Sequence, residues 1–176
     1  MNRGEEIAAA RLRRRVLYAL IAFWALVAQM VFPPAPRLVW NASASAPVGL
    51  WRVRPGARIR RGDMVIARTP TPVRRLAAER RYLPENVPLV KRVAGVAGDR
   101  ICAAGATITI NERVAARRLP ADRLGRPMPH WEGCRLLGSR EYFLLMADVP
   151  ASFDGRYFGI TLEAGIIGRA QPLWVR

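Results

Sequence analysis

The chain is predicted to be a mainly β domain that follows one N-terminal membrane-spanning helix. Three observations support this. An almost unbroken apolar run comes first, and from residue 38 onward the apolar residues occur in short runs with turn residues between them. The 14 prolines and 14 glycines are spread over the 176 residues, as expected for strands joined by irregular connections. Beyond the apolar run about 140 residues remain, enough for one hydrophobic core.

The apolar run is VLYALIAFWALVAQMVF at residues 16–32, where Gln29 is the one strongly polar residue. A helix of this length measures about 25 Å at about 1.5 Å per residue, which is short but sufficient for the core of a bilayer. Two prolines at 33–34 end it. We therefore predict one transmembrane helix.

The arginine run RLRRR at residues 11–15 decides the predicted orientation. Under the positive-inside rule, residues 1–15 are a cytoplasmic basic N-terminus, 16–34 the anchor in the inner (cytoplasmic) membrane, and 35–176 a periplasmic domain. The alternative is a cleaved signal peptide, because ASA at 42–44 offers small residues at the right spacing. That site lies about ten residues beyond the apolar run, farther than a usual cleavage region, which favours a retained single-pass anchor.

Seven short apolar runs in the exported part predict strands. They are GLWRVR (49–54), DMVIAR (63–68), PLVKRVAG (88–95), ATITI (106–110), RVAA (113–116), EYFLLMA (141–147) and GIIGRAQPLWV (165–175). Asn111 and Glu112 separate two of these runs and predict a hairpin turn. Only residues 72–83 have a helix-like composition, and Pro72 suits a first helical turn.

The formal net charge of +16 would suit nucleic acid or an anionic membrane surface. Apart from the run at 11–15 and a few pairs, however, the positive residues are scattered, and no zinc-finger or RNP-like motif accompanies them. We therefore expect contact with membrane lipid and no specific nucleic acid partner.

Cys102 and Cys134 are the two cysteines of the domain predicted to be exported. In an oxidising compartment such a pair favours a disulfide over a metal site, and we expect no metal and no cofactor. The single histidine, His130, lies shortly before Cys134. A catalytic Cys134 paired with His130, or a Ser-His-Asp triad built on His130, are alternatives to a plain loop histidine, which is favoured.

Lys91 is the only lysine among 29 lysine and arginine residues. Arginine, with a pKa above about 12, cannot lose its proton in a protein, whereas burial can push a lysine toward neutrality. If LVKRV is a strand, Leu89, Lys91 and Val93 share one face, so the amine has apolar neighbours. Lys91 is therefore a candidate general base, and the chance survival of one lysine is the alternative.

Ser43 and Ser45 are two of only four serines and lie in the segment NASASAPVGLW. Small residues around them leave the segment open to an extended substrate backbone, and Pro47 and Gly49 bend the chain before a strong strand. A nucleophilic serine needs such an exposed position and a base to accept its proton. Lys91 would supply that base without a histidine. A polar linker between anchor and domain is the alternative.

Three segments, SASAPVGLW, LVKRVAGVAGD and SFDGRYFG, resemble motifs of the membrane-bound signal peptidase superfamily, most closely its conjugative-transfer branch, the TraF peptidases. Members carry a nucleophilic serine followed shortly by proline, a lysine in a V-K-R-x-x-G-x-x-G-D pattern and a late D-S-R-Y-W-G box. The second pattern is matched at Lys91, Arg92, Gly95, Gly98 and Asp99. The third is matched at Asp154, Arg156, Tyr157 and Gly159.

The resemblance extends from about residue 15 to the last residue and implies a signal-peptidase-like β catalytic domain with a Ser/Lys dyad. It implies that Ser45 is the nucleophile and Lys91 the general base. It also places Ser43 where such enzymes have a hydroxyl that joins the nucleophile's backbone N–H in the oxyanion hole, a donor typically worth about 3 kcal/mol of barrier.

The late box implies supporting roles. Asp154 would be required as well, holding Arg156 or the surroundings of the lysine in place. The alternative for Asp154 is a plain surface ion pair with Arg156. Ser152 would donate or accept a hydrogen bond at the lysine amine and so orient it.

The sequence departs from general signal peptidases in three ways. Ser45 is followed by Ala46 and Pro47 instead of a methionine and a later proline, and Val149 and Pro150 stand where leader peptidases have polar residues of a G-D-N-R run. The chain also lacks room for their large extra β domain. These departures favour the TraF branch over a role in general secretory cleavage.

The resemblance therefore implies a membrane-anchored serine endopeptidase that processes a conjugative pilin precursor or another exported polypeptide. Hydrolysis and cyclisation of the product both remain open, because they share one acyl-enzyme. The alternative from another class is a noncatalytic, basic, membrane-tethered subunit of a DNA-transfer apparatus.

Overall fold

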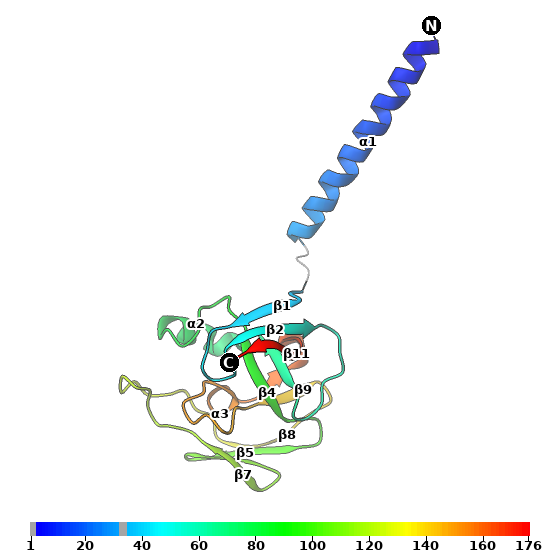
Figure 1. The fold of residues 1–176 in the computed structure, drawn as a ribbon. Helices are drawn as coiled ribbons and strands as arrows, with labels where there is room; N and C mark the ends of the chain where they lie inside the picture. The colour runs from blue at the N-terminus through cyan, green and yellow to red at the C-terminus, as the bar shows by residue number, and fades with distance from the viewer. Residues whose placement is uncertain (1–2, 32–34) are drawn as a thin grey trace. The chain divides into compact units, whose positions relative to one another are not determined.

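The computed structural model describes residues 3–31 and 35–176. The chain divides into two compact units, Met1–Ala35 and Pro36–Arg176, which are described separately. In the first unit the structure describes one helix, α1 (Arg3–Val31), drawn in blue in Figure 1. It starts well before the predicted residue 16, because the arginine run is helical too.

The part of α1 from Arg11 to Val31 is long and apolar enough to cross a membrane, with a mean hydropathy of 1.4. A signal sequence near an N-terminus passes the same test. Positions 32–34 of the predicted anchor lie outside the described residues.

The second unit is built mainly from two antiparallel sheets, which confirms the predicted mainly β fold (Figure 1). The larger sheet has seven strands in the order β1-β2-β11-β3-β4-β9-β10. Its strands are β1 (Leu38–Asn41), β2 (Gly49–Arg54), β3 (Met64–Ala67), β4 (Leu89–Gly95), β9 (Glu141–Leu144), β10 (Thr161–Leu162) and β11 (Ile166–Val175). The last strand of the chain lies between β2 and β3, so the two ends of this unit meet within one sheet.

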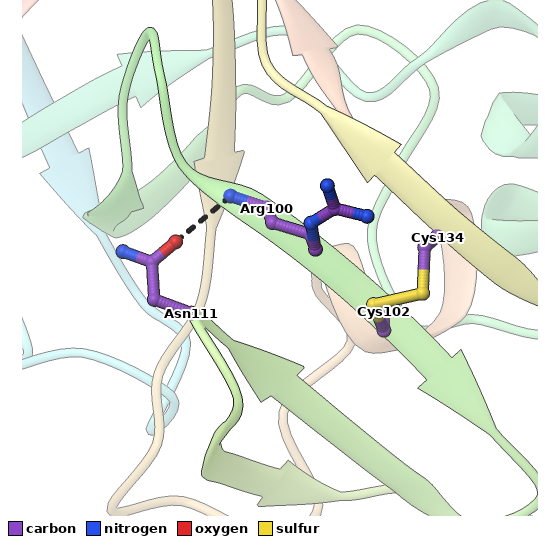
Figure 2. Close-up of a disulfide and its surroundings, with 4 residues drawn as sticks. All are labelled: Arg100, Cys102, Asn111 and Cys134. Carbon is purple, nitrogen blue, oxygen red and sulfur yellow. Dashed lines mark hydrogen bonds between the residues drawn. A yellow bond between two sulfur atoms is a disulfide. The ribbon is translucent and has the colours of Figure 1, made fainter.

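The smaller sheet has four strands in the order β7-β6-β5-β8. They are β5 (Arg100–Ala104), β6 (Thr107–Ile110), β7 (Arg113–Arg117) and β8 (Gly133–Leu136). Cys102 in β5 stands directly opposite Cys134 in β8, and the two form a disulfide (Figure 2). The predicted disulfide is therefore confirmed.

The predicted turn at Asn111 and Glu112 joins β6 to β7. Both residues have positive φ, 50° and 67°, as a two-residue turn of type I′ requires. The side chain of Asn111 reaches the start of β5, where its Oδ1 accepts a hydrogen bond of 2.9 Å from the backbone N–H of Arg100 (Figure 2).

The predicted helix at 72–83 is α2 (Thr71–Glu79), with a proline in its first turn as expected. It ends earlier than predicted, and Arg81 just beyond it takes a left-handed conformation with φ of 58°. Two short helical segments were not predicted, α3 (Gly155–Phe158) and the 3-10 turn at Glu163–Gly165.

All seven predicted runs contain a strand, whereas β1, β5, β8 and β10 were missed. Every residue of β8 is exposed, so it has none of the apolar alternation that identifies a half-buried strand. β10 has only two residues and gives no pattern to detect.

β4 is buried on both faces, with Arg92 as its only exposed residue. Val90 packs in the cluster that contains Trp51, while Val93 packs with Val65 and Leu144. The strand therefore lies deep in the unit, and any polar side chain on it loses most of its contact with water.

Candidate active site

Ser43 and Ser45 lie in the loop between β1 and β2, residues 42–48, which we call the serine loop. Ser45 is half-buried and lies in a turn, and Ala46 after it is buried in the core cluster that contains Trp51. The indole Nε1 of Trp51 donates a 3.1 Å hydrogen bond to the carbonyl of Pro47. The loop is therefore packed and hydrogen-bonded on its inner side, which is more order than a plain linker would have.

Lys91 lies in the middle of β4 and is only 2% exposed. Its Nζ is 2.7 Å from Ser45 Oγ and 2.8 Å from Ser152 Oγ. These partners are 46 and 61 residues away in the sequence, so only the folded chain brings the three groups together. The predicted apolar setting is also present, because the residue paired with Lys91 on β3 is the fully buried Val65.

Burial lowers the pKa of Lys91 from 10.5 to about 8. The loss of hydration disfavours the ammonium form and is the main cause. The negative charge of Asp154 opposes this effect and the positive charge of Arg156 adds to it. About a tenth of the amine is therefore neutral at pH 7, and this neutral fraction can act as a general base.

Ser43 is brought next to Ser45 by the turn between them. The two hydroxyl oxygens are 3.0 Å apart, and either can be the donor. The backbone N–H of Ser45 also points at Ser43 Oγ, at 3.4 Å. The hydroxyl and the N–H expected in an oxyanion hole are thus adjacent in space.

Asp154 and Arg156 form an ion pair that is completely enclosed, with side-chain exposures of 0% and 1%. The Nε of Arg156 donates a 2.8 Å hydrogen bond to Asp154 Oδ1. The other carboxylate oxygen accepts a 3.0 Å hydrogen bond from the backbone N–H of Met146. The alternative of a plain surface ion pair is therefore wrong, because both side chains are buried in the core.

Arg156 donates most of its remaining hydrogen bonds to the loop that follows β9, and one, of 3.2 Å, to the carbonyl of Arg117 at the end of β7. Its Nη atoms donate to the carbonyls of Met146, Val149 and Pro150 at 2.8, 3.2 and 3.0 Å. This loop leads directly to Ser152, whose backbone N–H donates to the carbonyl of Val149 at 3.0 Å. The buried arginine thus holds the segment that carries a partner of Lys91.

A shallow cleft of ≈ 290 Å³ opens beside Ser45. Small and apolar side chains from the serine loop and the loop after β9 form most of its wall. It is lined by Ala44, Ser45, Ala46, Pro47, Val48, Met146, Val149 and Arg176. The cleft has the size and chemistry to receive small side chains of an extended peptide next to the serine hydroxyl.

A comparison with protein-family models shows to which family the chain belongs. Residues 10–175 match the family model described as signal peptidase, peptidase S26. The chain belongs to the signal peptidase S26 family. This signal peptidase family member is also similar to proteins named for conjugal transfer, which confirms the resemblance to the TraF branch.

Two relatives illustrate that similarity. A probable conjugal transfer protein TraF of Sinorhizobium fredii is 35% identical, over 76% of this chain and 74% of the relative. A plasmid transfer protein TraF of Escherichia coli is 33% identical, over 76% of this chain and 80% of the relative. Among solved structures, a signal peptidase I of Enterococcus faecalis is similar with 19% identity and a TM-score of 0.37, covering 64% of this chain and 97% of that one.

Two sequence alternatives fail in this S26 peptidase. Cys134 is bonded to Cys102, so it has no thiolate to act as a nucleophile. His130 is exposed in the loop before β8, and the hydrogen-bond partners of Ser45 Oγ are Lys91 and Ser43. The described residues contain no group of three or more His, Cys, Asp or Glu side chains placed to hold a metal ion.

Sequence reasoning missed two residues that support the serine loop, Asn41 and Trp51. Their side chains bind the carbonyls of this loop from the inner side. A signal for Asn41 was available, because an amide directly before a stretch of small residues is a typical turn-forming side chain. Trp51 gave no such signal, since a tryptophan in a strand is first of all a core residue.

Proposed function

We propose that this S26 family member is a membrane-anchored serine endopeptidase in which Ser45 is the nucleophile and Lys91 the general base. The observation that carries the proposal is the 2.7 Å contact between Lys91 Nζ and Ser45 Oγ, made by a lysine that is buried and has a pKa lowered to about 8. A serine hydroxyl beside a neutral amine is an activated nucleophile.

In the acylation step, Ser45 Oγ attacks the scissile carbonyl carbon while its proton passes to Lys91 Nζ. The neutral amine accepts this proton with its lone pair. Ser152, 2.8 Å from Nζ on another side, accepts an N–H from the amine and keeps the lone pair aimed at Ser45. The resulting ammonium then returns the proton to the leaving amine, which leaves an acyl-enzyme.

The negative oxygen of the tetrahedral intermediate needs donors beside Ser45. The backbone N–H of Ser45 and the hydroxyl of Ser43 are the proposed donors. In the free protein this N–H points at Ser43 Oγ, and both groups turn to the negative oxygen when substrate binds; each such donor typically lowers the barrier by about 3 kcal/mol. Asp154 contributes to the site in two ways. Its charge favours the ammonium form of Lys91 that appears during attack, and it holds Arg156, which orders the loop that carries Ser152.

The relatives are named for conjugal and plasmid transfer, and this supports a substrate from a conjugation apparatus. The substrate proposed is the pilin precursor, with small residues next to the cut that fit the wall of small side chains around Ser45. Water resolves the acyl-enzyme to a linear pilin, whereas the amino group of the pilin's own N-terminus resolves it to a cyclic product.

The apolar helix α1 is proposed to anchor the enzyme in the inner membrane by a single pass, with the arginine run in the cytoplasm and residues 35–176 in the periplasm. The disulfide supports the periplasmic side, since such bonds persist in oxidising compartments. The anchor would keep the cleft near a precursor that is itself held in the membrane.

The test is co-expression of the full-length chain in membranes with the pilin precursor of its own transfer system, followed by mass spectrometry of the pilin. The wild type should produce shortened pilin, and Ser45→Ala should produce none. Ser139→Ala, at an exposed serine outside the site, is the matched control and should process normally. Processing that survives in Ser45→Ala would contradict the proposal and favour a noncatalytic tethered subunit.

The same spectra separate the two ways of resolving the acyl-enzyme. A cyclic pilin is one water molecule lighter than the linear chain of the same residues and has no free N-terminus. A linear product supports hydrolysis.

A further inference from the structure

Asn41, the last residue of β1, makes an unusual set of contacts with the serine loop. It is only 6% exposed. Its Nδ2 donates to three carbonyl oxygens of that loop, those of Ser43, Ala46 and Pro47, at 2.9, 3.0 and 3.0 Å. Its Oδ1 accepts a 3.1 Å hydrogen bond from the backbone N–H of Ser43. One side chain therefore binds both ends of the turn that presents Ser45.

These contacts fix the direction in which the peptide groups of the loop point. All peptide bonds of the described chain are trans, and in a planar trans peptide the carbonyl and the following N–H point in opposite directions. Since the carbonyls of Ser43 and Pro47 point inward at Asn41, the N–H groups of Ala44 and Val48 point away from it. Ala44 and Val48 both line the cleft beside Ser45.

The chemistry of the amide explains why asparagine suits this position. Three carbonyl oxygens that converge on one point repel each other unless a donor lies between them, and the NH₂ group supplies two N–H bonds there. The Ser43 N–H needs an acceptor on the same planar group, and the amide oxygen supplies it. An aspartate has the same shape but would place an acceptor oxygen against three carbonyls.

We propose that Asn41 is a positioning residue of the peptidase. By collecting the inward carbonyls of the serine loop, it holds Ser45 Oγ within reach of Lys91 and turns the N–H groups of Ala44 and Val48 toward the cleft, where they bind the main chain of the substrate. Asn41 contacts neither Lys91 nor the cleft itself, so it acts only through the loop. This inference rests on the proposed function.

The test measures kcat and KM of full-length variants in detergent with the same pilin precursor. Asn41→Ala removes all four hydrogen bonds, and Asn41→Asp keeps the shape while replacing the donor by an acceptor. The matched control is Asn111→Ala, because Asn111 also uses both ends of its amide at a turn, accepting from the Arg100 N–H and donating to the Asp99 carboxylate, but lies in the hairpin of the small sheet. Melting curves establish that each variant is folded at the assay temperature.

Asn41→Ala and Asn41→Asp should each lower kcat about 100-fold, the loss expected for a displaced nucleophile, and raise KM about tenfold. Asn111→Ala should stay within about twofold of wild type in both constants. The rise in KM distinguishes a positioning role of Asn41 from a purely stabilising role. A partly unfolded sample has a lower apparent kcat, but its remaining active molecules keep the original KM.

The proposal is overturned if Asn41→Asp keeps wild-type constants, since shape alone would then suffice. It is equally overturned if KM is unchanged in both Asn41 variants while kcat falls only in proportion to the folded fraction. A failure of the proposed function would look different, because Ser45→Ala would then process the precursor as fast as wild type.

Discussion

The two sheets of the second unit treat burial in opposite ways. In the seven-stranded sheet and the loops beside it, the buried residues include Lys91, Ser152, Asp154 and Arg156. In the four-stranded sheet the fully buried side chains are apolar, such as Ile101 and Ile108, and a disulfide ties two of its strands together. The first sheet encloses charge, and the second is linked covalently.

This difference separates function from stability. Taking a protonated lysine out of water is destabilising, and at Lys91 this burial lowers the pKa to about 8 beside the hydroxyl of Ser45. Beside the small sheet, Asp99 and Arg118 are buried as well, but each is paired with a half-exposed partner, Arg61 or Glu132. One strand of this sheet is exposed throughout, so its stability has to come from its apolar cluster, the hairpin and the disulfide. Changes at Lys91 and its partners should therefore lower catalysis, whereas changes in the small sheet should lower stability with little effect on catalysis.

The largest effect is expected for Lys91→Arg. It preserves the positive charge but replaces a group that can be neutral with one that cannot, so processing of the pilin precursor should fall at least about 1,000-fold. Arg92→Lys, the exposed neighbour on the same strand, should process within about twofold of wild type. Normal processing by Lys91→Arg, measured by mass spectrometry of pilin, would remove the basis for a Ser/Lys dyad.

The next effect concerns the buried ion pair. Asp154→Ala leaves the Arg156 guanidinium enclosed without its counter-charge, and the free energy of unfolding should fall by about 3–5 kcal/mol. Removing one partner of the exposed pair Arg140–Glu163, as in Glu163→Ala, should cost about 0–1 kcal/mol. Denaturant titrations of the full chain in detergent measure both. If both variants lost the same free energy of unfolding, burial of the Asp154–Arg156 pair would have no energetic consequence.

The disulfide should show the reverse balance between stability and activity. The double change Cys102→Ala and Cys134→Ala should lower the free energy of unfolding by about 2–4 kcal/mol, because the unfolded chain is no longer constrained. Well below the melting temperature, kcat should stay within about twofold of wild type, since the bond lies in the small sheet. A loss of kcat comparable to that of Lys91→Arg in protein verified as folded would break the division between the two sheets.

The smallest effect is the pH dependence of the wild type. The neutral form of Lys91 is the active one, and its pKa is lowered to about 8, so activity should rise with pH and level off above about 9. At pH 7 the rate should be about a tenth of the plateau. Initial rates of precursor processing between pH 6 and 10 measure this. If the rate instead rose around pH 10.5, the ordinary pKa of lysine, burial would not lower the pKa of Lys91 in the working enzyme.

Much of the site was visible in local patterns. The single lysine in a chain of arginines, and its place in an apolar strand, indicated a base that has to lose its proton. Ser43 and Ser45 among small residues indicated an accessible hydroxyl, and the two cysteines of an exported domain indicated their bond. The burial of Lys91 and the disulfide are both found in the structure, because each depends on a residue's own chemistry or on the two-residue period of a strand.

Other features could not be inferred in this way. Strand β8 has no buried residue, so nothing in its composition distinguishes it from a loop. The enclosure of Asp154 depends on the loop between β9 and α3, and the contacts of Asn41 depend on a turn in which three carbonyls point inward. The sequence by itself determined the chemical groups, the apolar anchor segment and most strands, because these follow from residue type and short-range period. Only the tertiary structure decided that Lys91 Nζ lies 2.7 Å from Ser45 Oγ, because strand pairing and core packing bring together residues that are 46 positions apart.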